Sequence, residues 1–268
     1  MGSAVTGASV RRVFLGAFVL ALVPTAMGCA AAEPEEDVTG ASQALVGGTT
    51  TLEHPEIGRF YRADGMCTGT LVRPDVVLTA AHCFPLADDL DVSKASPSWR
   101  FLVTTADGVN HRYVVDRAHS ILQRSELGSG NDWRTYDLAL LHLAAAVPAA
   151  IAEPAALASE WTLPGARVAL FGYGCTMAGT HEGVGTKRTI ESSWTFGQWL
   201  GFSTSHALCQ GDSGGPLLDV STNAVLGTNS GADGKDRFSD VPKSRVAIDA
   251  MIAHWAHWAS FRNALAGG

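Results

Sequence analysis

Residues 209–216 read CQGDSGGP, and the interpretation of the whole chain depends on this stretch. Its glycines and its proline are typical of a turn, in which Ser213 would be only a polar residue. A serine hydroxyl is a weak nucleophile at neutral pH. It becomes catalytic beside an imidazole base whose tautomer is fixed by a carboxylate. The chain must therefore also supply a histidine and an acid.

Two other stretches contain such groups. His82 lies near the end of the apolar run VVLTAAHC (76–83), and Asp137 opens the apolar run DLALLHL (137–143). Taken singly, a histidine at a strand end and an aspartate in a surface turn are common and need no catalytic explanation. An aspartate that leads a buried strand does need a hydrogen-bonding partner when it is covered. The three residues together support a hypothesis that none of them supports alone.

The stretches LTAAHC, DLALLHL and GDSGGP, in this order, resemble motifs of the chymotrypsin/trypsin-like serine peptidases, and the chain resembles a bacterial, exported member. The resemblance extends from about Leu45 to the C-terminal helix. It implies an all-β fold of two six-stranded antiparallel β-barrels with a C-terminal α-helix. It also implies a serine endopeptidase that acts on polypeptides through an acyl-enzyme and needs no cofactor.

The same resemblance implies a role for each site residue. His82 would be the general base, Asp137 its orienting partner and Ser213 the nucleophile. The backbone N–H groups of Gly211 and Ser213 would form the oxyanion hole. Glycine suits position 211 because a side chain would crowd the carbonyl under attack. Losing one such donor typically costs about 3–4 kcal/mol of transition-state stabilisation.

Residues 43–48, QALVGG, resemble the N-terminus that members of this family expose by proteolysis, so a zymogen is expected. A cut between Ala44 and Leu45 would give Leu45 a free ammonium group, which the resemblance pairs with Asp212. Breaking a buried pair of this kind costs about 3–5 kcal/mol, enough to decide whether a loop is ordered. Read alone, LVGG is only a strand start and a turn. Ala44 replaces the usual Arg or Lys, so we expect an activating protease that is not trypsin-like.

The N-terminal residues 1–29 have the pattern of a signal peptide: two arginines, an apolar run short for a membrane span, and then small residues. The ending TAMGC resembles a lipoprotein signal, in which Cys29 would be lipidated; Met27 is larger than usual there, and ordinary cleavage nearby is the alternative. Residues 30–44 are small, acidic and aperiodic, as in a linker or propeptide. The peptidase domain is expected at 45–268, in an exported protein that is an outer-envelope lipoprotein or is secreted.

The chain has five cysteines. Export implies an oxidising compartment, and setting Cys29 aside leaves an even number that suggests two disulfides. The resemblance pairs Cys67 with Cys83 at the histidine loop. The segment FGYG before Cys175 resembles the family segment that approaches the oxyanion loop, so a bridge from Cys175 to Cys209 is also expected.

Specificity is expected to depend on Ala207, six residues before Ser213, which aligns with the base of the family's primary pocket. Trypsin-like enzymes carry an aspartate there. A Lys or Arg side chain would enter this pocket without a partner at a large desolvation cost, so the sequence predicts an apolar P1 residue. LGTNSGA (226–232) resembles the strand that pairs with substrate, so Ser230 and Ala232 are expected to line the pocket.

Short apolar runs separated by Gly, Pro and Asp predict many β-strands. The expected strands are MCTGTLV, VVLTAAHC, RFLVTT, HRYVVD, DLALLHL, RVALFGYG, GGPLLDV and AVLGTN. Residues 244–266 predict one helix, with Val246, Ile248, Ile252 and Trp255 on its buried face.

Composition excludes several other functions. The formal net charge is −7 and no Lys/Arg run occurs, so nucleic acid is not an expected partner. The acidic stretch LADDLD (86–91) could bind a hard cation, but solvated acidic loops are commoner, and no metal site is assigned. Membrane contact is expected only through lipid at Cys29, and the protein is expected to be a monomer. The alternative function is a catalytically silent, peptidase-like binding protein at the cell surface.

Overall fold

The computed structural model describes residues 45, 48–62, 65–84, 90–91, 98–121, 136–176, 180–194, 207–232 and 236–266, without the side chains of 90, 91 and 258–266. The chain divides into two compact units, Met1–Gly40 and Ala41–Gly268, and every described residue belongs to the second. The expected signal peptide, Cys29 and the linker at 30–44 lie outside the described residues, so these remain predictions. Among the described helices, none is long and apolar enough to cross a membrane.

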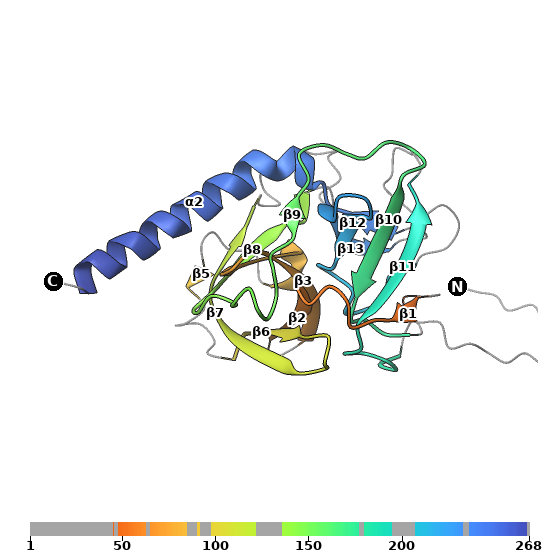
Figure 1. The fold of residues 1–268 in the computed structure, drawn as a ribbon, viewed down its shortest axis with the longest axis horizontal. Coiled ribbons are helices and arrows are strands. Elements are labelled where there is room, and N and C mark those ends of the chain that lie inside the picture. The colour runs from red at the N-terminus through yellow and green to blue at the C-terminus, as the bar shows by residue number, and fades with distance from the viewer. Residues whose placement is uncertain are drawn as a thin grey trace, which may run out of the picture. The chain divides into compact units, whose positions relative to one another are not determined.

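The first sheet closes into a six-stranded antiparallel barrel (Figure 1). Its strands are β2 (Ile57–Arg62), β3 (Gly65–Arg73), β4 (Val76–Thr79), β6 (Arg100–Thr104), β7 (Asn110–Ser120) and β8 (Ala139–Leu143). Their order is β7-β6-β2-β3-β4-β8, and pairing of β8 with β7 closes the ring. The short β5 (Leu90–Asp91) adds to the free side of β7.

The second sheet has the order β1-β11-β10-β12-β13-β14. Its strands are β1 (Thr49–Thr50), β10 (Arg167–Gly172), β11 (Arg188–Ser193), β12 (Pro216–Asp219), β13 (Ala224–Ala232) and β14 (Asp236–Phe238). β9 (Ala156–Leu157), from the segment that joins the two halves of the chain, pairs in parallel with β13. The pairings among the described residues leave this sheet open between β1 and β14, whereas the first sheet forms the closed barrel that was expected.

Both faces of the central strands are buried, and successive side chains enter different parts of the core. Val77 and Leu141 face the interior of the first barrel, where they join Phe60 and Phe101. Their neighbours Val76, Leu78 and Leu140 instead join a second cluster with residues of β10, β12 and β13. This is the two-residue alternation of a β-strand with apolar residues on both sides. One chain segment therefore stabilises both halves of the fold.

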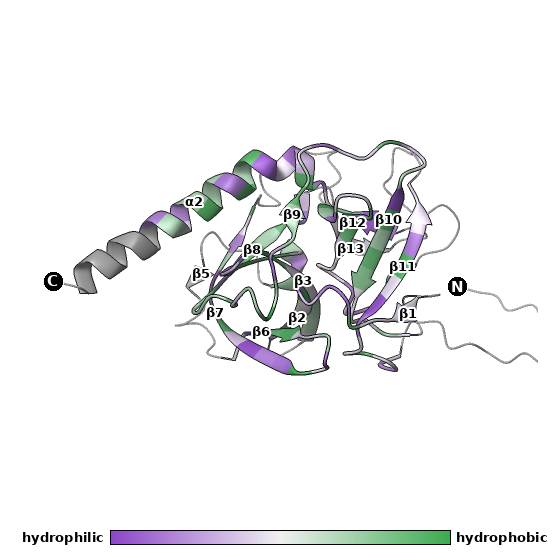
Figure 2. Cartoon of the chain, viewed as in Figure 1, coloured by the Kyte–Doolittle hydropathy of each residue, from purple (hydrophilic) through white to green (hydrophobic). Residues whose placement is uncertain are grey.

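The C-terminal helix α2 (Val241–Ala266) begins beside the strands, and its far end extends away from them (Figure 1). Over its first part, which Figure 2 colours, hydrophobic and hydrophilic residues alternate. Ile248 and Trp255 are buried and Ile252 is half-buried, but Val246 is 84% exposed, so its assignment to the buried face was wrong. Two residues of an α-helix subtend about 200°, which places Val246 opposite Ile248. The predicted all-β fold with one C-terminal helix is confirmed.

Candidate active site

Strand register brings His82 and Asp137 together. β4 pairs with β8 so that Thr79 lies opposite Ala139. The chain beyond β4 enters the short 3-10 helix η1 (Ala81–Cys83), and Asp137 lies just before β8. The backbone N–H of His82 donates to Asp137 Oδ1 at 2.8 Å, and His82 Nδ1 lies 2.6 Å from Asp137 Oδ2. Two bonds to one carboxylate fix both the backbone and the ring of the histidine.

The carboxylate of Asp137 is almost fully covered, with 1% of its side chain exposed, whereas 31% of the His82 side chain is exposed. Ser230 Oγ on β13 donates a third hydrogen bond to Asp137 Oδ2 at 2.5 Å. A buried carboxylate needs such partners, and here they come from both sheets. Sequence reasoning placed Ser230 in the substrate pocket and did not foresee its bond to Asp137.

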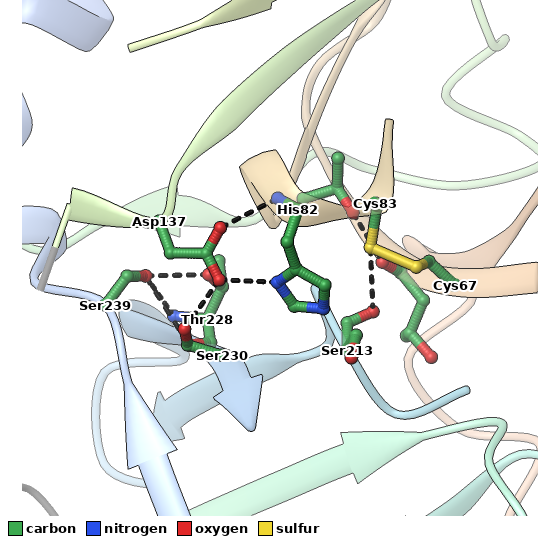
Figure 3. A network of polar contacts seen from close by, with 10 residues as sticks. Cys67, His82, Cys83, Asp137, Ser213, Thr228, Ser230 and Ser239 are labelled. Carbon is green, nitrogen blue, oxygen red and sulfur yellow. Dashed lines mark hydrogen bonds and ion pairs between the residues drawn. A yellow bond between two sulfur atoms is a disulfide. The ribbon is translucent and has the colours of Figure 1, made fainter. Parts of the chain in front are cut away.

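Ser213 faces the other side of the imidazole (Figure 3). It lies in the turn before β12 and is partly exposed. Its carbonyl oxygen accepts a hydrogen bond from the Thr68 N–H at 2.8 Å. Among the described contacts, Ser213 Oγ is not hydrogen-bonded to His82. Catalytic hydrogen bonds are often loose in substrate-free enzymes and tighten when substrate binds.

The glycines on either side of Asp212 and Ser213 have conformations that other residues rarely adopt. Gly211 has φ +102° and Gly214 has φ +81°. A Cβ at Gly214 would lie 2.1 Å from Thr79 Oγ1, so a side chain cannot be accommodated there. The turn glycines of GDSGGP are therefore required by backbone geometry.

Asp212 is buried below this turn. Its carboxylate accepts hydrogen bonds from Gly174 N–H at 2.7 Å and Cys209 N–H at 2.8 Å. Within the described part of the chain, no Lys, Arg or His side chain lies within ion-pair distance of it. Burial is the main cause that raises the pKa of Asp212 to about 7, and the two backbone hydrogen bonds oppose it. Arg188 also lowers this pKa electrostatically but forms no ion pair with Asp212 among the described contacts, so burial dominates and favours the neutral form.

Leu45 is also buried, at 1% exposure, in a cluster with Val168, Leu170 and Leu208. In the intact chain its nitrogen is part of a peptide bond and carries no charge. The structure therefore places both residues of the expected activation pair in the core but contains no ion pair between them.

Both expected disulfides are present. Cys67 on β3 is bonded to Cys83 of η1, beside His82. Cys175 is bonded to Cys209, four residues before Ser213, and Cys175 N–H also donates to Gln210 O at 3.0 Å. The two bridges therefore flank the site from the histidine side and from the serine side.

A buried carboxylate near the expected pocket, Asp236, was missed by sequence reasoning. Ala207 N–H donates to Asp236 Oδ2 at 2.8 Å and Leu208 N–H to Oδ1 at 3.0 Å. β13 pairs with β14 so that Ala232 lies opposite Asp236. The expectation of an apolar P1 residue rested on Ala207 alone and did not take this carboxylate into account. An aspartate at the start of a strand was the available signal, since Asp236 opens β14.

No three His, Cys, Asp or Glu side chains form a metal-binding group in the described part of the chain. The acidic stretch 86–91 lies outside that part except for the backbone of β5. The chemistry available at the site is that of a histidine, its carboxylate and a serine hydroxyl.

Comparison with known proteins agrees with this geometry. The family model described as Trypsin matches residues 45–251. A protein named Trypsin from Saccharopolyspora erythraea is 27% identical over 209 residues, which cover 71% of this chain and 87% of that protein. Coagulation factor XII from Rattus norvegicus is 30% identical over 204 residues, which cover 65% of this chain but 33% of that protein.

Solved structures support the fold. Neuropsin, a serine protease expressed in mouse brain, superposes with a TM-score of 0.60 at 18% identity, covering 77% of this chain and 99% of that one. Human heparin binding protein superposes with a TM-score of 0.59 at 19% identity, covering 76% of this chain and 95% of that one. At such low identity these likenesses concern the fold alone.

Proposed function

The chain belongs to the trypsin family of serine endopeptidases, and from that premise we propose that it cleaves peptide bonds with His82, Asp137 and Ser213 as its catalytic triad. The observation that carries the assignment is the pair of bonds from His82 to the buried Asp137 carboxylate, at 2.8 and 2.6 Å, with Ser213 on the open side of the ring. This arrangement supplies a base, its orienting acid and a nucleophile from three separate segments.

In the proposed reaction Ser213 Oγ attacks the substrate carbonyl while His82 Nε2 takes its proton. Asp137 accepts from Nδ1, which fixes the tautomer and stabilises the imidazolium that forms. The N–H groups of Gly211 and Ser213 would bind the oxyanion. His82 then protonates the leaving amine, and a water molecule activated by the same imidazole hydrolyses the acyl-enzyme.

The proposal includes a zymogen. Cleavage between Ala44 and Leu45 would create an ammonium group next to the buried cluster that holds Leu45. Burial raises the pKa of Asp212 to about 7 even though Arg188 lowers it electrostatically, so this carboxylate lacks an ion-pair partner that the Leu45 ammonium would supply. The activating protease is a separate partner, because Ala44 offers no Lys or Arg for self-activation by a trypsin-like cut.

For specificity the sequence supports an apolar P1 residue, because Ala207 carries no charge, and the buried Asp236 supports a cationic P1 residue as the alternative. Asp236 is fully buried, bonded to the backbone of Ala207 and opposite Ala232. A Lys or Arg side chain that reached this carboxylate would meet an opposite charge. In a low-dielectric pocket this charge favours Lys or Arg at P1 over an apolar side chain. Ser230 and Ala232 would form the adjoining wall.

The remaining proposals concern location. The segment 1–29 would direct export, lipid at Cys29 would be the sole membrane contact, and 45–268 would be the peptidase domain, acting as a monomer.

The first experiment uses a soluble chain that begins at Ala30. Its N-terminus is sequenced before and after incubation with general proteases, and each form is treated with a fluorophosphonate serine probe. Labelling after processing to Leu45, abolished by Ser213→Ala, would support the nucleophile and the zymogen. Strong labelling of the intact chain would support Ser213 as the nucleophile and would show that no zymogen cleavage is needed.

The alternative function is a catalytically silent binding protein. One structural neighbour is named for heparin binding, but heparin is a polyanion and this chain has a net charge of −7, which opposes such a ligand. A folded chain that begins at Leu45 and takes no fluorophosphonate would decide for the binding function.

A further inference from the structure

The N–H of Ser213 belongs to the peptide group between Asp212 and Ser213. This group is held by hydrogen bonds to its carbonyl oxygen. Its carbonyl, Asp212 O, accepts Gly215 N–H at 3.0 Å and Asn229 Nδ2 at 3.0 Å. Because a trans peptide is planar, fixing the direction of its C=O fixes the opposite direction of its N–H. Within the described part of the chain, this N–H itself has no acceptor. The side chain of Asn229 therefore helps to set where the Ser213 N–H points.

Thr68 holds the carbonyls on either side of that peptide. Its Oγ1 donates to Gly211 O at 2.8 Å, and its backbone N–H donates to Ser213 O at 2.8 Å. The same hydroxyl accepts Tyr173 N–H at 3.1 Å, and Thr79 Oγ1 donates to Thr68 O at 2.8 Å. One residue of β3 thus joins the serine loop to the second sheet and to the end of the strand that leads to His82.

Both side chains are entirely buried, so water cannot substitute for these bonds. Asn229 Nδ2 also donates to Phe171 O at 3.1 Å, and reversing its amide would turn an oxygen toward two carbonyls. Buried hydrogen bonds of this kind are costly to lose, because the partner left behind stays desolvated. These bonds therefore restrict the conformation of the serine loop independently of substrate.

We propose that Thr68 and Asn229 are positioning residues that orient the N–H groups of Gly211 and Ser213 toward the oxyanion. Neither residue touches the reacting atoms; each acts through a carbonyl of the serine loop. Donors that are already oriented need no reorganisation during the reaction, and for this reason they stabilise the transition state strongly. This inference rests on the proposed function, since it concerns the same acyl transfer.

The test compares Thr68→Val, Thr68→Ser and Asn229→Leu in the processed enzyme. The matched control is Thr70→Val: Thr70 lies on the same strand and is equally buried, but its hydroxyl has no hydrogen-bond partner in the described contacts. For each variant, kcat and KM are measured on a fluorogenic peptide, with the inhibition constant of a peptide aldehyde that forms a tetrahedral adduct. Thermal unfolding shows that each variant is folded at the assay temperature.

Thr68→Val and Asn229→Leu should lower kcat by about 10- to 100-fold, part of what loss of a whole oxyanion donor costs. KM should stay near its original value, and aldehyde affinity should fall in parallel with kcat. Thr68→Ser should restore kcat, and Thr70→Val should match the wild type. Should Asn229→Leu fail to fold, the threonine series still decides.

Two results would overturn this inference but leave the proposed function intact. The first is a folded Thr68→Val variant with unchanged kcat. The second is a Thr70→Val variant that loses as much kcat as Thr68→Val, which would indicate a general effect on packing. A processed wild type without activity would instead remove the proposed function, and this inference with it.

Discussion

The cationic alternative for P1 assigns selectivity to one buried carboxylate, Asp236. Replacing it by Asn keeps the shape but removes the charge. A hydrogen bond to a charged group is worth about 1.5–3 kcal/mol, so Asp236→Asn should lower kcat/KM for Arg substrates by about 10- to 100-fold relative to Phe substrates. Initial rates on matched peptides that differ only at P1 measure this ratio.

The ratio of kcat/KM for Arg to that for Phe substrates is the informative quantity, because Asp236 also accepts hydrogen bonds from the backbone of Ala207 and Leu208. A purely structural role would lower activity toward both substrates equally, and an unchanged Arg-to-Phe ratio would refute the cationic preference. Ala207→Asp is a second check: it adds a carboxylate next to the first, and mutual repulsion should raise the pKa of one of them.

At the scale of elements, Trp255 is one of the residues that attach the C-terminal helix. Trp255 is buried in the core cluster and meets the ring of His142 edge-on, with centroids 5.5 Å apart. Trp255→Ala should lower the free energy of unfolding by about 3–5 kcal/mol, the usual effect of truncating a core aromatic residue. Urea unfolding followed by far-ultraviolet circular dichroism measures it, in the Ser213→Ala background so that the protein cannot digest itself.

Val246→Ala is the matched control on the same helix. Because Val246 is exposed, its truncation should change stability by no more than about 0.5 kcal/mol. Equal effects of the two substitutions would mean that the helix does not dock through Trp255.

Elements with strong alternation were predictable from the sequence. Every expected apolar run contains a strand, and the pairing of β4 with β8 brings His82 and Asp137 together. β11 was not predicted, because RTIESS is largely polar and half-exposed. The contacts of Thr68 and Asp236 could not be predicted from the sequence either. They depend on how strands distant in the sequence pair, and no local pattern encodes that pairing.

At the scale of the whole molecule, the cut before Leu45 is expected to change how stability depends on pH. In the intact chain, burial raises the pKa of Asp212 from 3.8 to about 7. The folded state then holds this proton more tightly than the unfolded state, so the contribution of Asp212 to stability is fully present below about pH 4 and is lost as pH rises through about 7. The difference between the two pKa values corresponds to about 4 kcal/mol.

After processing, the Leu45 ammonium would lie against Asp212, which favours the carboxylate and lowers its pKa. We therefore expect the intact Ser213→Ala chain to lose stability between pH 4 and 8 and the processed chain to lose much less. Denaturant unfolding of both forms over this range measures the difference. The intact chain with Asp212→Asn has no titratable group at this position, so its free energy of unfolding should depend less on pH.

The comparison separates activation from mere trimming. A trimmed N-terminus that stayed in solvent would leave the buried Asp212 without an ion-pair partner, and the stability of both forms would then fall together as pH rises. Divergent curves require the new ammonium to reach the carboxylate below the serine loop. That loop carries the N–H groups proposed to bind the oxyanion, so the pH dependence of stability would report, independently of any substrate, whether the cut completes the site.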